Sequence, residues 1–146
     1  MDRRLTRPPG ADPLTAGPAT SGPETTGSAA TGPASAAEAL IARFNLAWSR
    51  HDLAAALALI SEDCVFESTG PAPDGQRSVG KAAIRGAWQP IFDDASSQFT
   101  VEEFFTAGPR VVQRWRYDWD GGYVRGVDVM TVAGGLVTAK LSYVKG

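Results

Sequence analysis

Apolar residues between positions 35 and 93 recur three or four residues apart, which is the spacing of one face of a helix. Ser35 and Glu38 have the spacing of a capping box, so we expect the first helix to begin there. Asp52 is placed to cap a second helix, and a third is predicted from about Gly80 to Asp93. The residues expected to face the interior are Leu40, Ile41, Phe44, Ala47 and Trp48, then Leu53, Ala56, Leu57 and Ile60, then Ile84, Trp88 and Ile91.

The second half of the chain alternates between apolar and polar residues, as strands do. Strands are predicted over residues 98–106, 111–119, 123–132 and 136–144, because glycine-containing turns separate these segments. A shorter strand is predicted at Cys64–Ser68, followed by a loop from Thr69 to Ser78. Helices followed by an antiparallel series of strands predict an α+β domain in which the helices cover one face of a twisted sheet.

The strand predicted over residues 123–132 carries a carboxylate on a hydrophobic face. Because side chains alternate between the two faces of a strand, Asp128 shares its face with Val124, Gly126, Met130 and Val132. A carboxylate in such surroundings must be ion-paired, be protonated, or border a water-filled cavity. Asp128 is therefore the main candidate for a functional group.

The strands on either side of Asp128 supply further candidates. In the last strand, Tyr143 is expected on the apolar face together with Val137, Ala139 and Leu141. In the strand before, Gln113 and Trp115 share one face with three other residues, Val111, Tyr117 and Trp119.

The opposite face of the Asp128 strand is also apolar, at Val127 and Val129. A strand that is apolar on both sides is rarely left open to water. We therefore predict a homodimer formed through the outer face of the sheet.

The composition describes an ordinary globular chain with a polar leader. Residues 1–34 consist mostly of Pro, Gly, Ala, Thr and Ser, so we expect this tail to be disordered and residues 35–146 to form one domain. A net charge of −2 gives no reason to expect nucleic acid or a membrane surface as a partner. The single cysteine, Cys64, is interpreted as an inert core thiol, and the expected location is cytoplasmic.

Several common functional motifs fail or do not occur. Residues 75–81 have the spacing of a phosphate-binding loop, but Ala82 stands where a hydroxyl should reach magnesium. No zinc, calcium or serine-hydrolase motif is present, so no metal and no cofactor are expected. His51 is interpreted as a cap or surface residue.

The order of elements resembles the nuclear transport factor 2-like (NTF2-like) superfamily over roughly residues 36–146. The residues that carry this resemblance are Arg125–Met130, Gly135–Val137 and Ser142–Lys145. Within the superfamily the chain is most similar to the SnoaL-like proteins and more distantly to ketosteroid isomerase. The resemblance implies a cone, in which three N-terminal helices pack on a curved, mostly antiparallel sheet that encloses an apolar pocket.

When the functional residues of these families are matched to this sequence one by one, they favour the cyclase activity over steroid isomerisation. Asp128 matches both the protonated, hydrogen-bond-donating aspartate of ketosteroid isomerase and the acid–base aspartate of SnoaL-type cyclases. The general base of the isomerase falls at Ser68, and its oxyanion-binding tyrosine falls at Phe44. Because neither side chain can take that role, isomerisation by the steroid mechanism is not expected.

Two functions fit these residues. In the first, the protein is an isomerase-like or cyclase-like enzyme without a cofactor, and Asp128 exchanges a proton with a small hydrophobic carbonyl compound. Trp48, Trp115 and Tyr143 would contact this substrate, and Gln113 or Arg125 would orient it. In the second, the domain is a non-catalytic ligand-binding or dimerisation module. Asp128 is then a satisfied internal carboxylate, paired with Tyr143 or with water, and the tryptophans are core residues.

Overall fold

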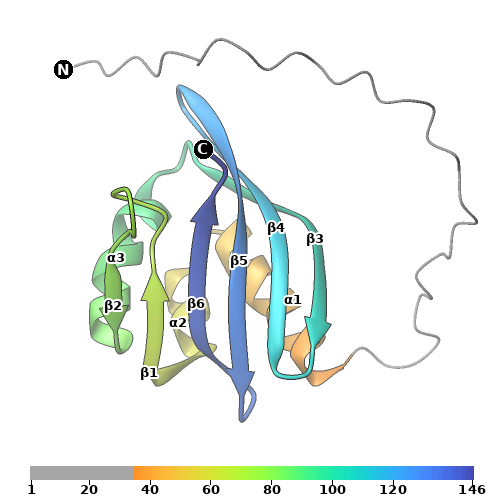
Figure 1. Cartoon of the computed structure of the whole chain (residues 1–146). Coiled ribbons are helices and arrows are strands. Elements are labelled where there is room, and N and C mark those ends of the chain that lie inside the picture. Colours follow the sequence, from red (N-terminus) through yellow and green to blue (C-terminus); the bar gives the residue numbers. More distant parts are fainter. Residues whose placement is uncertain (1–34) are drawn as a thin grey trace, which may run out of the picture. The chain divides into compact units, whose positions relative to one another are not determined.

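The structure is a computed structural model that describes residues 35–146 (Figure 1). The segment predicted to be disordered, residues 1–34, lies outside the described residues. Within the described part, three helices pack against one side of a curved, mostly antiparallel sheet of six strands. The α+β class and the arrangement expected from the sequence are therefore confirmed.

The helices begin where the sequence predicts them. Their bounds are Ala36–Ser49 for α1, Leu53–Ala58 for α2 and Lys81–Asp93 for α3. The Ser35 hydroxyl accepts a hydrogen bond from the backbone N–H of Glu38 at 3.1 Å, and the Asp52 carboxylate accepts one from Ala55 at 3.0 Å. Both predicted caps are confirmed. Among residues 35–146, no helix is long and apolar enough to cross a membrane.

The sheet joins the two halves of the chain. Its strands are β1 (Ile60–Glu67), β2 (Arg77–Val79), β3 (Gln98–Ala107), β4 (Arg110–Trp119), β5 (Gly122–Ala133) and β6 (Leu136–Val144). They lie in the order β2-β1-β6-β5-β4-β3. β1 and β6 run parallel, and the other neighbouring strands run antiparallel. Figure 1 shows β6 between β1 and β5, with α1 and α2 behind the sheet.

Two expectations about the first strands are wrong. Ile60 does not belong to the second helix but begins β1, because it pairs with Val137 of β6. Part of the predicted loop is the short strand β2, in which Val79 pairs with Val65 of β1. In both cases a long-range strand pairing overrides the local pattern.

The core between the helices and the sheet is rich in aromatic rings. Trp48 of α1 lies at its centre, with ring centroids 5.0 Å from Trp88 and 4.7 Å from Phe92, both on α3. On the sheet, Trp115 packs across Gly126, and its ring occupies the space that a Cβ at residue 126 would need. The inner face of the sheet, which we define as the face toward the helices, is therefore walled by large rings.

A register shift in the β5–β6 pair decides which residues of β6 face inward. Thr131 pairs with Ala139, whereas the next residue, Val132, pairs with Val137. Residues on β6 therefore change sides beyond this point, since side chains alternate with period two. Val137 is buried, as predicted, but Lys140 is the next fully inward residue.

The same shift makes one prediction about the site wrong. Tyr143 was expected on the inner face, but its side chain lies on the outer face and is 56% exposed. Its neighbour Ser142 takes the inner position and pairs with Asp128 in the register of the sheet.

Candidate functional site

Asp128 lies on the inner face of β5 and is fully buried, as its pattern predicts. Its carboxylate is held from three sides. Gln113 of β4 donates from Nε2 to Oδ2 at 3.0 Å, and Ser142 of β6 donates from Oγ to Oδ1 at 2.7 Å. Lys140 of β6 places its Nζ 3.3 Å from Oδ1, which makes a buried ion pair.

Asp128 receives hydrogen bonds from a network that begins on α1. Gln113 accepts from Asn45 Nδ2 at 2.8 Å through Oε1, so its amide N–H is turned toward Asp128. Lys140 Nζ donates to Ser142 Oγ at 2.9 Å, which leaves the hydroxyl hydrogen of Ser142 for Asp128. An ionised carboxylate only accepts hydrogen bonds, and Asp128 accepts all three.

Lys140 connects the buried carboxylate to the aromatic wall. Its ammonium group lies 5.0 Å from the ring centroid of Trp48 and 5.2 Å from that of Phe66. Both distances fall within the range of cation–π attraction. The pair of Asp128 and Lys140 thus carries no net charge and has polar or aromatic partners around it.

An apolar cavity, which we call the inner pocket, adjoins this pair. It has a volume of about 150 Å³ and lies between the aromatic cluster and the sheet. Its lining residues are Trp48, Phe66, Ser68, Thr69, Ile91, Phe99, Trp115, Tyr117, Val124, Lys140 and Ser142. Asp128 stands behind Lys140 and Ser142, so these two residues are its polar link to the cavity.

A second cavity, the mouth hollow, adjoins the inner pocket. It has a volume of about 410 Å³ and shares Ser68, Thr69 and Ser142 with the inner pocket. Tyr143 and Asp74 line its other sides. The two cavities therefore meet at these three shared residues.

The site residues predicted from the sequence do not all lie in the inner pocket. Trp48 and Trp115 line the inner pocket, whereas Gln113 is buried against Asp128 and does not line it. Tyr143 lines the mouth hollow instead of contacting Asp128.

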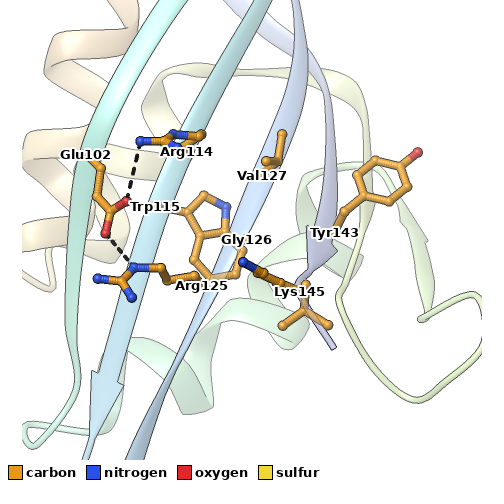
Figure 2. Close-up of a pocket in the computed structure, with 9 residues that line it drawn as sticks. Glu102, Arg114, Trp115, Arg125, Gly126, Val127, Tyr143 and Lys145 are labelled. Carbon is orange, nitrogen blue, oxygen red and sulfur yellow. Dashed lines mark hydrogen bonds and ion pairs between the residues drawn. The ribbon is translucent and has the colours of Figure 1, made fainter. Parts of the chain in front are cut away.

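Arg125 points to the opposite face of the sheet, where Figure 2 shows it beside a third cavity. Its Nε donates to Glu102 at 2.8 Å, and this hydrogen bond holds the pKa of Glu102 below its ordinary value. Arg125 is thus not available to orient a molecule in the inner pocket.

Sequence reasoning missed Lys140, Ser142 and Asn45. Lys140 and Ser142 share a face by period two, and a lysine among apolar residues is a visible signal. The alternation places Ala139, Leu141 and Tyr143 on the apolar face, which leaves Lys140 and Ser142 on the opposite one. Only the register shift at Thr131, which depends on the paired strand, reveals the true orientation.

Cys64 is interpreted as an inert thiol, and the structure agrees. The residue is fully buried at the start of the apolar part of β1. Burial raises the pKa of its thiol to about 11, with a further increase from Asp63. The sulfur therefore stays protonated near neutral pH, so it is a poor nucleophile.

The fold and the inner pocket define a class of protein, an α+β cone with a cavity between helices and sheet. The sequence model of the SnoaL-like domain matches residues 41–140, so the chain belongs to the SnoaL-like family. No curated protein matches the chain.

Solved structures show the same fold. An NTF2-like protein of unknown function from Mesorhizobium loti is 43% identical, with a TM-score of 0.71, over 76% of this chain and 92% of that one. A Mycobacterium tuberculosis protein crystallised with estradiol-17β-hemisuccinate is 26% identical, with a TM-score of 0.63, over 74% of this chain and 92% of that one. A putative ketosteroid isomerase from Kribbella flavida is similar in fold, with 19% identity and a TM-score of 0.66 over 76% of this chain and 78% of that one.

The buried ion pair between Asp128 and Lys140 predicts how single and double substitutions change the free energy of unfolding. Lys140→Met leaves the Asp128 carboxylate buried and unpaired, so the free energy of unfolding should fall by about 3–5 kcal/mol. The double variant Asp128→Asn/Lys140→Met removes both charges and should recover most of that loss. Urea unfolding at pH 7 measures these differences.

Lys81→Met is the matched control, since Lys81 forms an exposed ion pair with Glu62 at 3.5 Å. Its effect should stay within about 1 kcal/mol. A Lys140→Met variant as stable as the wild-type protein would show that the buried pair does not form.

Proposed function

We propose that this SnoaL-like protein binds a small, largely apolar molecule in the inner pocket. The observation that carries the proposal is a cavity of about 150 Å³ walled by aromatic rings, with Lys140 and Ser142 at one side. Ligand sites are typically apolar cavities with a few placed polar groups, and this cavity has that character. The M. tuberculosis relative crystallised with a steroid ester supports small-molecule binding by this fold.

The size of the inner pocket limits the buried part of the ligand. An apolar cavity of about 150 Å³ holds a molecule the size of benzene. A ligand with a single six-membered ring would fill it, and any further atoms would lie in the mouth hollow beside Tyr143. Tyr143 would then contact the ligand from outside the inner pocket, not from the wall predicted for it.

Acid–base catalysis through Asp128 is the second candidate function. Its specific support is that Ser142 hydrogen-bonds to the carboxylate at 2.7 Å and also lines the inner pocket. A proton taken from a carbon next to a ligand carbonyl could pass to Asp128 through this hydroxyl, and isomerisation or cyclisation could follow. The steroid-isomerase mechanism is not proposed, because Ser68 donates its hydroxyl to the Gly70 carbonyl at 2.7 Å and Phe44 has no hydroxyl.

We also propose that the protein forms a homodimer through the outer face of the sheet. Val127 and Val129 are half-buried there, and two large side chains of the same sheet remain open to solvent. Phe105 is 55% exposed and Tyr143 is 56% exposed. A second copy of this face would cover these apolar groups.

Filling the inner pocket should weaken ligand binding. Val124 lines it, so Val124→Phe should weaken binding of a one-ring probe such as acetophenone by at least about tenfold. Val79→Phe is the matched control, since Val79 is 57% exposed on β2 and should leave affinity unchanged. NMR titration following the indole N–H signals of Trp48 and Trp115 measures both. Equal affinity in the two variants would place the binding site elsewhere.

The catalytic candidate predicts exchange of hydrogen next to a carbonyl. Wild-type protein should speed the exchange of the acetophenone methyl hydrogens in D₂O, and Asp128→Asn should reduce this rate by about 100-fold or more. Asp63→Asn, an exposed carboxylate on β1, is the control and should exchange as fast as the wild type. Proton NMR follows the reaction. Binding of acetophenone without wild-type exchange would leave the non-catalytic function.

The dimer is tested by a charge on its proposed interface. Val129→Arg should convert a dimer into a monomer, because the arginine would lose hydration in an apolar contact. Leu46→Arg, at a position 47% exposed on α1 and so on the helix side of the sheet, should leave the dimer intact. Sedimentation equilibrium measures the mass of each variant, and a wild-type monomer at about 100 μM would refute the dimer, since stable homodimers associate more tightly.

A further inference from the structure

We propose that Lys140 selects the ligand by donating a hydrogen bond to a neutral acceptor oxygen, the carbonyl of a one-ring ketone or aldehyde. This inference rests on the proposed binding function and names the chemical class of the ligand. It assigns the selective contact to Lys140, which lies between the buried carboxylate and the cavity.

The hydrogen bonds of Lys140 leave one donor for a ligand. An ammonium group carries three N–H donors. At most two of them are used on the sheet, toward Asp128 Oδ1 at 3.3 Å and Ser142 Oγ at 2.9 Å. No third acceptor contacts Nζ within residues 35–146.

The position of Nζ places that donor at the inner pocket. The rings of Trp48 and Phe66 lie 5.0 and 5.2 Å from Nζ, and both rings line the pocket. Because the two satisfied donors point to the sheet, the remaining one points away from it, between these rings. A ligand oxygen at this end of the cavity would accept the remaining hydrogen bond of the Lys140 ammonium group.

Charge decides between a neutral and an anionic oxygen. Asp128 already neutralises Lys140, so a carboxylate in the inner pocket would add an unpaired negative charge in apolar surroundings. A carbonyl oxygen accepts the same hydrogen bond without that penalty. Among the other donors at the cavity, Ser68 already donates to Gly70 and Ser142 to Asp128. The hydroxyls of Thr69 and Tyr117 and the indole N–H groups of Trp48 and Trp115 also line the cavity, but they are neutral donors, and a neutral donor forms a weaker hydrogen bond than an ammonium group does.

The test compares three probes of similar shape: acetophenone, which has the carbonyl, ethylbenzene, which lacks it, and benzoate, which is charged. Affinities are measured by NMR titration of wild-type protein and of Asp128→Asn/Lys140→Met. The double variant is used because it leaves no unpaired buried charge. Lys81→Met is the control, since its lysine is remote from the cavity lining.

We expect the preference for acetophenone over ethylbenzene to fall by about tenfold or more in the double variant, as for loss of a charge-assisted hydrogen bond. Lys81→Met should keep the wild-type preference, and benzoate should bind the wild type more weakly than acetophenone does. An unchanged preference, or benzoate binding as tightly as acetophenone, would overturn the role of Lys140 while leaving ligand binding intact. Failure of every probe to bind would refute the proposed function as well.

A second measurement needs no variant and keeps the role of Lys140 falsifiable if the double variant does not fold. The infrared carbonyl stretch of acetophenone should move to lower wavenumber when the probe is bound to wild-type protein, because a charged donor weakens the C=O bond. A bound carbonyl that absorbs where it does in an apolar solvent would show that Lys140 makes no hydrogen bond to it.

Discussion

The ion pair between Asp128 and Lys140 lies where three strands and the first helix meet. Asn45 of α1 contacts Gln113 of β4, Gln113 contacts Asp128 of β5, and Lys140 and Ser142 of β6 complete the chain. Burying two charges is costly unless each is paired and hydrogen-bonded. The network therefore requires all four elements to adopt one register, because a slip of one residue would leave a charge without its partner.

The irregularity of β6 makes this network possible. In an uninterrupted alternation from Val137, the inward residues would be Ala139, Leu141 and Tyr143, and Asp128 would face an apolar surface. The register shift at Thr131 instead turns Lys140 and Ser142 inward. β-Bulges often redirect a side chain next to a functional site, and here the redirected side chain is the cation of the site.

The sequence alone predicts the structural features that are determined by residues close together in the chain. The caps at Ser35 and Asp52, the turns between the later strands, and the inner position of Asp128 follow from spacing and turn chemistry alone. What the sequence does not reveal depends on distant partners. Ile60 looks helical until Val137 pairs with it, and Arg77 and Ser78 look like the end of a loop until β1 lies beside them. Lys140 belongs to this second group, so the polar half of the site was not predictable.

The place of β6 in the sheet has a consequence for how the chain acquires its structure during synthesis. β6 is the last of the six strands to leave the ribosome, yet it lies between β1 and β5. Until it emerges, the nascent chain carries two open strand edges and an aspartate without its counter-ion. The sheet is completed and the buried aspartate is paired in the same late step, when β6 enters between β1 and β5.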